Sequence, residues 1–446
     1  MTAGSGATGG REVLRLAVPA FLALVAEPMF LLADTAIVGH LGTEPLAGLG
    51  IAGAVLLTAA NIFVFLAYGT TSVVARQVGA GSTRGAVEAG IDGAWLAVVL
   101  GALTGAAVAV AAHPLCRAFG SSPATVEQGV TYLRIAAIGI PAMLIVLACT
   151  GVLRGLQDTR TPLVTAVLGF GGNIALNLLF VYGFHWGIAG SAIGTVVAQC
   201  GMALALVVVL GRYAARSGAV VRPHPARVLA AALGGVPLLV RTLALRAILL
   251  LTTWVAAGLG DVPLAAYQVS ATIWSFLAFA LDAIAIAAQA LTGKALGAGD
   301  AADARAMTTL MIRWGWAGGL GLGLVILATH TLLPHVFTSD PDVQAAIATG
   351  LIVVALGQPL SGFVFVVDGV LIGAGDTRWL AAAMLAVLAV YLPVVLTVRA
   401  LLPAGTSAPA AIGWLWAAFT GFMAIRAAFF WWRVRGDRWL VLGATR

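Results

Sequence analysis

The sequence predicts an all-α polytopic membrane protein, with twelve transmembrane helices in two six-helix lobes related as parallel repeats. Three observations predict this class. Of the 446 residues, 61% are hydrophobic and only 9% are charged, whereas soluble proteins average about 25% charged residues. Twelve apolar runs are each long enough to cross a bilayer, which takes about 20 residues. The two halves of the chain also match at a constant offset of 218 residues, which carries Pro45 onto Pro263.

The positions of the apolar runs predict the two lobes and the spans within them. We expect the first lobe over 13–211 and the second over 230–433, joined by a cytoplasmic loop at 212–229. Residues 1–12 are expected to be a flexible N-terminus and 434–446 a cytoplasmic tail. The expected spans lie at 13–40, 47–75, 86–112, 127–152, 161–182, 186–211, 230–257, 264–292, 306–333, 342–370, 379–402 and 409–432.

Basic residues indicate how the chain is oriented. Twenty of the 24 Lys and Arg residues fall at one set of span ends, and only Arg117 and Arg399 fall at the opposite ends. By the positive-inside rule we expect both termini to be cytoplasmic. We expect the membrane to be the cell's inner (plasma) membrane. The net charge of +7 is therefore interpreted as a topology signal. Because no basic patch is interleaved with aromatic residues, we expect no nucleic-acid partner.

The internal repeat carries specific motifs. GVLRGLQDTR at 151–160 matches GVLIGAGDTR at 369–378, and the GAG turn at 79–81 matches GAG at 297–299. Each half holds six spans, an even number, so both halves enter the membrane from the same side. Transporters built from such parallel repeats bind substrate between or within the lobes and work by alternating access. Asp158 and Asp376, which are repeat mates in these turns, are expected to cap the helices that follow.

Nothing in the sequence indicates an enzyme. Neither the cysteines nor the histidines have metal-ligand spacing, and the phosphate-binding pattern GxxxxGK[ST] of ATP-driven transporters does not occur. We therefore expect no metal, no cofactor and no catalytic residue. The cysteines and histidines without metal-ligand spacing are Cys116, Cys149, Cys200, His40, His113, His185, His224, His330 and His335.

The first span carries two acids, Glu27 and Asp34, with Pro28 between them. An ionisable side chain at membrane depth is costly and usually functional. Seven residues separate the two acids, about two helical turns, so they share one helix face. Pro28 removes a backbone donor and is expected to be a hinge. The stretch is typical of a proton or cation site, although a paired carboxylate that only joins helices is the alternative.

The chain resembles the MATE (multidrug and toxic compound extrusion) antiporters, and within them the DinF-like branch. The resemblance covers about Leu14 to Trp432. It rests on AVPAFLALVAEPMFLLADTAIVGHLG in the first span, on the paired GVLxGxxDTR motifs, and on LDAIAIAAQALTGKALGAGD at 281–300. It implies export of amphipathic, often cationic organic compounds, coupled to inward flow of H⁺ or Na⁺. Members of this branch are generally considered proton-coupled.

The resemblance also suggests a cation-coupling site. Asp34 matches the acid of the family's first helix, and Asn173 matches a polar position on the fifth. Asn177 falls where some relatives carry a second aspartate, and Glu27 where relatives often carry a neutral polar residue. Asn173 and Asn177 are one helical turn apart, on one face. A buried carboxylate gains from protonation, so these residues could form a proton site; the alternative is an Asn–Asp hydrogen bond that only joins helices.

A second pair of charges lies in the other half. Arg246 and Asp282 are roughly 14 Å and 15 Å from the cytoplasmic ends of adjacent spans by helical rise. Equal depth predicts a buried, structural ion pair, with a role in gating or substrate contact as the alternative. Met29, Phe30 and Trp274, with Thr195, could line an adaptable apolar cavity, since Met and aromatic side chains suit flat cations.

The main functional prediction is a proton-coupled antiporter for small molecules that acts as a monomer in the lipid bilayer. Two alternatives stay open, a Na⁺-coupled antiporter and a flippase for a lipid-linked precursor. The offset of 218 carries Asp34 onto Thr252 and Glu27 onto Leu245. The second lobe therefore lacks these acids, and we expect the coupling chemistry to reside in the first lobe alone.

Overall fold

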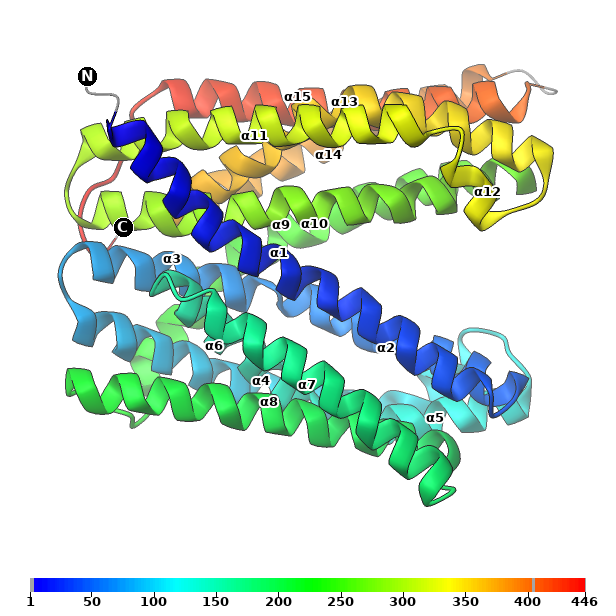
Figure 1. The fold of residues 1–446 in the computed structure, drawn as a ribbon, viewed down its shortest axis with the longest axis horizontal. Helices are drawn as coiled ribbons and strands as arrows, with labels where there is room; N and C mark the ends of the chain where they lie inside the picture. Colours follow the sequence, from blue (N-terminus) through cyan, green and yellow to red (C-terminus); the bar gives the residue numbers. More distant parts are fainter. Residues whose placement is uncertain (1–3, 403–405, 446) are drawn as a thin grey trace. The chain divides into compact units, whose positions relative to one another are not determined.

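The computed structural model describes residues 4–402 and 406–445, apart from the side chains of residues 4–9 and Glu27. Within that part of the chain every regular element is a helix (Figure 1). The helices are α1 (Gly4–Gly39), α2 (Thr43–Phe63), α3 (Phe65–Gly79), α4 (Thr83–Arg117), α5 (Pro123–Ala137), α6 (Ile140–Gly155), α7 (Arg160–Leu178), the π-helical turn η1 (Leu179–Gly183), α8 (Gly187–Ser217), α9 (Pro225–Ala257), α10 (Asp261–Gly297), α11 (Ala301–Thr329), α12 (Leu333–Phe337), α13 (Pro341–Gly373), α14 (Thr377–Leu401) and α15 (Ala408–Arg435).

The predicted number of spans is confirmed. Eleven helical stretches in the described residues are long and apolar enough to cross a membrane, and α5 with α6 adds a twelfth that is bent by 51°. The bend falls at Ile138 and Gly139, just before Pro141. It occurs within the expected span 127–152.

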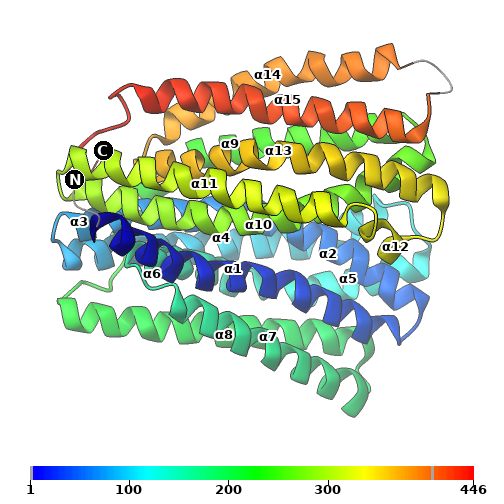
Figure 2. The ribbon, with the colours of Figure 1, turned by 45° about the horizontal axis from the view of Figure 1, so that its top comes forward.

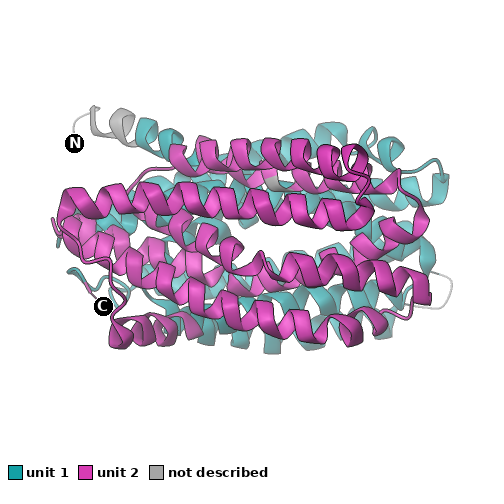
Figure 3. Ribbon diagram, turned by 90° about the horizontal axis from the view of Figure 1, so that it is seen from below, with its two compact units in different colours: residues 1–17, 237–444, 446 teal, residues 18–236, 445 magenta. Residues whose placement is uncertain are grey.

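The chain forms two compact units, coloured separately in Figure 3. Unit 2 holds Val18–Val236, with Thr445; unit 1 holds the chain up to Ala17 together with Pro237–Ala444. The boundaries thus fall inside α1 and α9, two helices that continue from one unit into the other.

The repeat is visible in the turns between helices. Ser82 and Asp300, which are 218 residues apart, both cap a helix, and each side chain accepts a hydrogen bond from the backbone N–H three residues further on. Gly81 and Gly299 precede them with φ of +76° and +79°, a left-handed conformation that glycine adopts without steric cost. The same local chemistry therefore builds the same turn in both halves.

The two Asp-Thr-Arg motifs differ. Asp158 caps α7 as expected, because its Oδ1 accepts from the backbone N–H groups of Arg160 and Thr161 at 3.1 and 2.9 Å. The prediction is wrong for Asp376, whose side chain makes no cap bond to α14. Its Oδ2 instead accepts from Arg433 Nε at 2.6 Å, so the second motif ties the start of α14 to α15.

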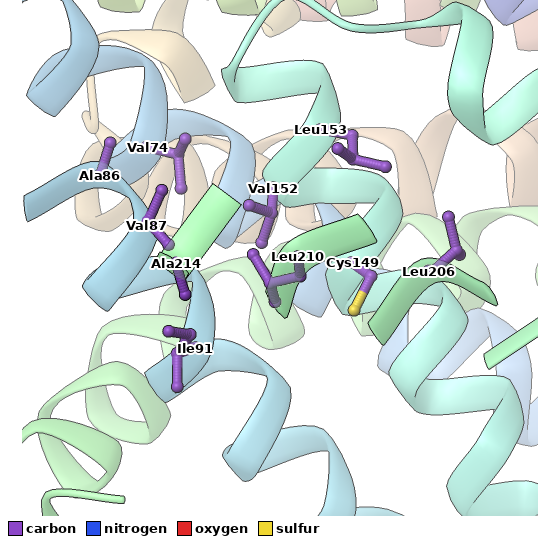
Figure 4. Close-up of a cluster of buried hydrophobic side chains, with 10 residues drawn as sticks. All are labelled: Val74, Ala86, Val87, Ile91, Cys149, Val152, Leu153, Leu206, Leu210 and Ala214. Atoms are coloured by element: carbon purple, nitrogen blue, oxygen red, sulfur yellow. The ribbon is translucent and has the colours of Figure 1, made fainter. Parts of the chain in front are cut away.

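Unit 2 has a core of small and branched apolar side chains where α3, α4, α6 and α8 meet (Figure 4). Val87 and Ile91 of α4 lie there with Val152 of α6 and Leu206 and Leu210 of α8, all buried. Chain segments distant in sequence are thereby fixed against one another, which positions α8 for the site described below.

In unit 1, α13 packs against α10, α11 and α15 (Figure 2). The approach to α11 is close enough to require glycine. A Cβ on Gly362 would lie 2.0 Å from the carbonyl oxygen of Gly315, and a Cβ on Gly315 would lie 2.5 Å from that of Gly362. Small residues that bring helix backbones together in this way are the usual means of packing helices in lipid.

Candidate functional site

Asp34 lies at the centre of a buried polar cluster in unit 2. Its side chain is 3% exposed, and three helices supply its hydrogen-bond donors. Asn177 Nδ2 of α7 and Ser191 Oγ of α8 each donate to Asp34 Oδ1 at 2.7 Å. Tyr132 OH of α5 donates to Oδ2 at 3.4 Å. The carboxylate of α1 therefore joins four helices at one point.

The cluster continues away from Asp34 along α7 and α8. Asn177 Nδ2 also donates to Asn173 Oδ1 at 3.0 Å, across the predicted turn of α7. Asn173 Nδ2 donates to Thr195 Oγ1 at 3.1 Å. All these side chains are at most 7% exposed. Together they form one chain of hydrogen bonds from Thr195 to Asp34.

The partners of Asp34 are hydroxyl and amide groups; in the described residues no basic side chain bonds to it. Three donors favour the ionised carboxylate, whereas burial in an apolar environment favours the neutral acid. The amide oxygen of Asn177 is buried and accepts no hydrogen bond from a described residue. The donors and the burial thus act in opposite directions on the protonation of Asp34, and the Asn177 amide oxygen beside it is available as an acceptor. Such an arrangement can exchange a proton or a small cation.

The structure brings together four of the residues that the sequence singled out, namely Asp34, Asn173, Asn177 and Thr195. Thr195, expected in a substrate cavity, bonds to Asn173. The side chain of Glu27 lies outside the described residues, so its place in the site stays a prediction. Tyr132 and Ser191 were missed, because a tyrosine or a serine in an apolar run is ordinary; only their contacts with Asp34 reveal them.

The predicted cavity residues lie in different units. Met29 of α1 is 58% exposed, and Phe30 stacks on Phe170 of α7 with ring centroids 5.1 Å apart. Trp274 of α10, in unit 1, packs edge-on against Phe419 of α15 with centroids 5.1 Å apart. Their part in substrate binding, and that of Pro28 as a hinge within α1, stay predictions.

The corresponding position of the second repeat holds a neutral pair. Thr252 of α9 is the repeat mate of Asp34, and Tyr391 of α14 is the mate of Asn173. Their hydroxyl groups lie 2.7 Å apart and both residues are fully buried. In unit 1 the mates of Asp34 and Asn173 thus bond to each other directly and include no carboxylate. In unit 2 Asn177 bonds to both Asp34 and Asn173.

The buried charges of unit 1 centre on Asp368 of α13. Arg241 Nε of α9 donates to its Oδ1 at 3.1 Å and Arg241 Nη2 bonds to Oδ2. Arg426 Nη2 of α15 lies 3.1 Å from the same Oδ2. All three residues are at most 7% exposed. Both arginines belong to the twenty basic residues that the sequence suggests as topology signals, but in the structure they are partners of a buried acid.

The predicted pair of Arg246 and Asp282 lies on the expected helices. Arg246 is exposed on α9, and Asp282 is partly buried on α10. Their pairing stays a prediction. In the described residues, no group of three or more His, Cys, Asp or Glu side chains could hold a metal ion.

The family model described as MatE matches residues 19–179 and again residues 237–397. The two matches begin 218 residues apart, which is the offset of the repeat. Each of them starts at a proline, Pro19 or Pro237.

Among curated proteins, Protein DETOXIFICATION 43 of Arabidopsis thaliana is 30% identical over 94% of this chain and 89% of its own length. DNA damage-inducible protein F of Escherichia coli is 28% identical over 93% of this chain and 90% of its own. Among solved structures, the Vibrio cholerae MATE transporter VcmN in the bent form superposes with a TM-score of 0.87 at 20% identity, covering 97% of this chain and 98% of that one. A MOP superfamily transporter from Pyrococcus furiosus gives 0.84 at 20% identity and 96% coverage of both.

Proposed function

Because this chain belongs to the MatE family of membrane transporters, we propose that it exports amphipathic, often cationic organic compounds in exchange for protons. The proposal rests on Asp34, a buried carboxylate of α1 that accepts hydrogen bonds from neutral donors of three other helices. Such an acid can gain and lose a proton without breaking an ion pair. It also bonds α1 to α5, α7 and α8, so a change in its protonation can alter how α1 packs on them.

The proposed cycle follows from the bonds of Asp34. In the ionised state, Tyr132, Asn177 and Ser191 donate to the carboxylate and hold α1 against α5, α7 and α8. Hydrogen bonds to a charged group are about twice as strong as neutral ones. Protonation weakens them and lets α1 repack, with Pro28 as the hinge. The repacking releases a cationic substrate, and loss of the proton on the other side restores the bonds.

Sodium is the second candidate coupling ion, and one observation favours it. The amide oxygen of Asn177 is a buried acceptor with no donor among the described residues, and it belongs to the residue that bonds to Asp34. Hard cations bind oxygen ligands of this kind. Asp34 and Asn177 could supply a carboxylate and a carbonyl oxygen to one bound ion.

Transport driven by separate gradients distinguishes the two ions. The purified protein would be reconstituted in liposomes that are loaded with the fluorescent cation ethidium. Efflux of ethidium would then be followed under a pH gradient alone or a sodium gradient alone. The proposal predicts efflux under the pH gradient, and little under the sodium gradient. Efflux driven only by sodium would replace the proton with Na⁺ as the coupling ion.

We further propose that the protein acts as a monomer in the cytoplasmic membrane, with both termini in the cytoplasm. The distribution of Lys and Arg supports this orientation. A reporter active only in the cytoplasm, fused after Arg446, should be active; the same reporter inserted after Arg117 should be silent.

A further inference from the structure

We propose that Pro237 in α9 and its repeat mate Pro19 in α1 are paired hinges at which the two units move relative to each other. Both helices run without interruption through their proline, and each continues from one unit into the other at that point. The boundary in α1 lies between Ala17 and Val18, and that in α9 between Val236 and Pro237. The proposal does not depend on which ion drives transport.

The first part of α9 is fixed to unit 2. Arg227 Nη1 bonds to Glu88 of α4 at 3.0 Å, and its Nε lies 3.1 Å from Asp92. Just before the proline, Gly235 lies so close to the ring of Phe65 that a Cβ there would be 2.5 Å from it. The segment from Pro225 to Val236 is therefore held by α3 and α4.

The rest of α9 is fixed to unit 1. Leu238, directly after the proline, is 1% exposed. Arg241 forms its ion pair with Asp368 of α13, and Thr252 bonds to Tyr391 of α14. A single helix is thus anchored to different units on the two sides of Pro237.

The first helix has the same arrangement. Before Pro19, a Cβ on Gly10 would lie 3.5 Å from the ring of Trp314 of α11, in unit 1. After it, Phe30 stacks on Phe170 and Asp34 bonds to Asn177, both in unit 2. α1 is thus also anchored on both sides of its proline.

Proline is the residue expected at a joint of this kind. It has no N–H to donate to the carbonyl four residues back, and its ring crowds that carbonyl, so a helix bends there. The bonds missing are those to the carbonyls of Arg15 in α1 and Leu233 in α9. The exposure of the neighbouring residues is similar at both prolines. The residues before them, Val18 and Val236, are 49% and 48% exposed, and the residues after them, Ala20 and Leu238, are 2% and 1% exposed.

α9 has an additional soft element. Gly234 and Gly235 immediately precede Val236 and Pro237. A Cβ on Gly234 would meet no atom within 4 Å, so close packing does not require glycine there. Glycine lowers helix stability relative to alanine, which makes α9 easier to bend on the side of Pro237 nearer unit 2.

The test measures motion between the units directly. Spin labels would be attached to two exposed helix residues, Ala215 of α8 in unit 2 and Ala302 of α11 in unit 1, on a background without native cysteines. Pulsed electron paramagnetic resonance in liposomes then gives the populations of distances between the two labels. We expect more than one population in the parent protein. Pro19→Ala and Pro237→Ala should each change their ratio about fivefold, which is what one net backbone hydrogen bond is worth.

Two further variants complete the experiment. Pro393→Ala changes an exposed proline inside α14 that lies within unit 1, and it should leave the populations unchanged. Gly234→Ala, which fits the structure sterically, should shift the ratio in the same direction as Pro237→Ala and keeps the test valid if that variant fails to fold. Equal populations in the parent, Pro19→Ala, Pro237→Ala and Gly234→Ala proteins would overturn the proposal, as would an equal shift in Pro393→Ala.

Discussion

At the scale of single residues, Gly194 of α8 determines where Asn177 can lie. A Cβ on Gly194 would be 2.1 Å from Asn177 Oδ1, so the amide fits only because no side chain is present. We predict that Gly194→Ala displaces Asn177, abolishes gradient-driven efflux and costs about 1–3 kcal/mol of stability, as overpacking usually does. Thermal unfolding and the liposome assay measure both effects.

Gly201→Ala is the matched control for that substitution. It makes the same change on the same helix, and a Cβ there would meet no atom within 4 Å. It should leave efflux and stability close to those of the parent. Equal efflux by the two variants would mean that the position of Asn177 does not matter for transport.

Ser191 and Tyr132 differ in how closely they approach the carboxylate, at 2.7 and 3.4 Å. Removing a donor destabilises the ionised form of Asp34 relative to the neutral form, so protonation then occurs at higher pH. We predict that the pH profile of efflux shifts upward in both Ser191→Ala and Tyr132→Phe. The shift should be larger for Ser191→Ala, whose bond is shorter. A downward shift, or the reverse order, would contradict the geometry.

Part of this site could be predicted from the sequence. Asp34, Asn173 and Asn177 are conspicuous because strongly polar side chains are costly in an apolar run. Ser191 and Tyr132 carry no such signal, since hydroxyl groups are common in membrane helices. Tyr132 also lies on α5, which ends at the 51° bend before α6, and periodicity does not indicate that bend.

At the scale of helices, Asp368 joins α9, α13 and α15 through Arg241 and Arg426. Removing one partner of a buried ion pair leaves an uncompensated charge and typically costs about 3–5 kcal/mol. We predict that Asp368→Asn lowers the unfolding temperature of the purified protein markedly. Asp437→Asn breaks the exposed pair with Arg305 and should change it little, because surface ion pairs contribute weakly. Similar effects of the two substitutions would show that the buried cluster is not structural.

The sequence did not predict this cluster, for a physical reason. Arg426 lies in the C-terminal half of α15, where an arginine gives the same signal whether it faces the cytoplasm or reaches inward to an acid. Arg241 lies midway along α9, and its position in the sequence does not identify the acid that it contacts. Asp376 shows the same limitation. Its motif shares seven of ten residues with that around Asp158, but in the structure Arg433 Nε lies 2.6 Å from its Oδ2.

At the scale of the whole molecule, the fold could be predicted nearly completely. Apolar runs, their number and the 218-residue repeat depend on local composition and spacing, which a single sequence records. The two matches to the MatE family, at 19–179 and 237–397, follow the same repeat. What divides the units could not be predicted, since α1 and α9 are continuous helices and their anchoring depends on contacts between distant residues.

Whether Asp34 exchanges a proton for substrate can be measured as proton release on substrate binding. A cation that the parent protein transports would be added to detergent-solubilised protein in weak buffer, with a pH indicator present. If Asp34 exchanges its proton, up to about one proton is released per parent molecule, and none is released from Asp34→Asn. Asp158→Asn, which changes the capping acid of α7, should behave like the parent. Equal release by the parent and Asp34→Asn proteins would show that Asp34 is not the group that exchanges its proton for substrate.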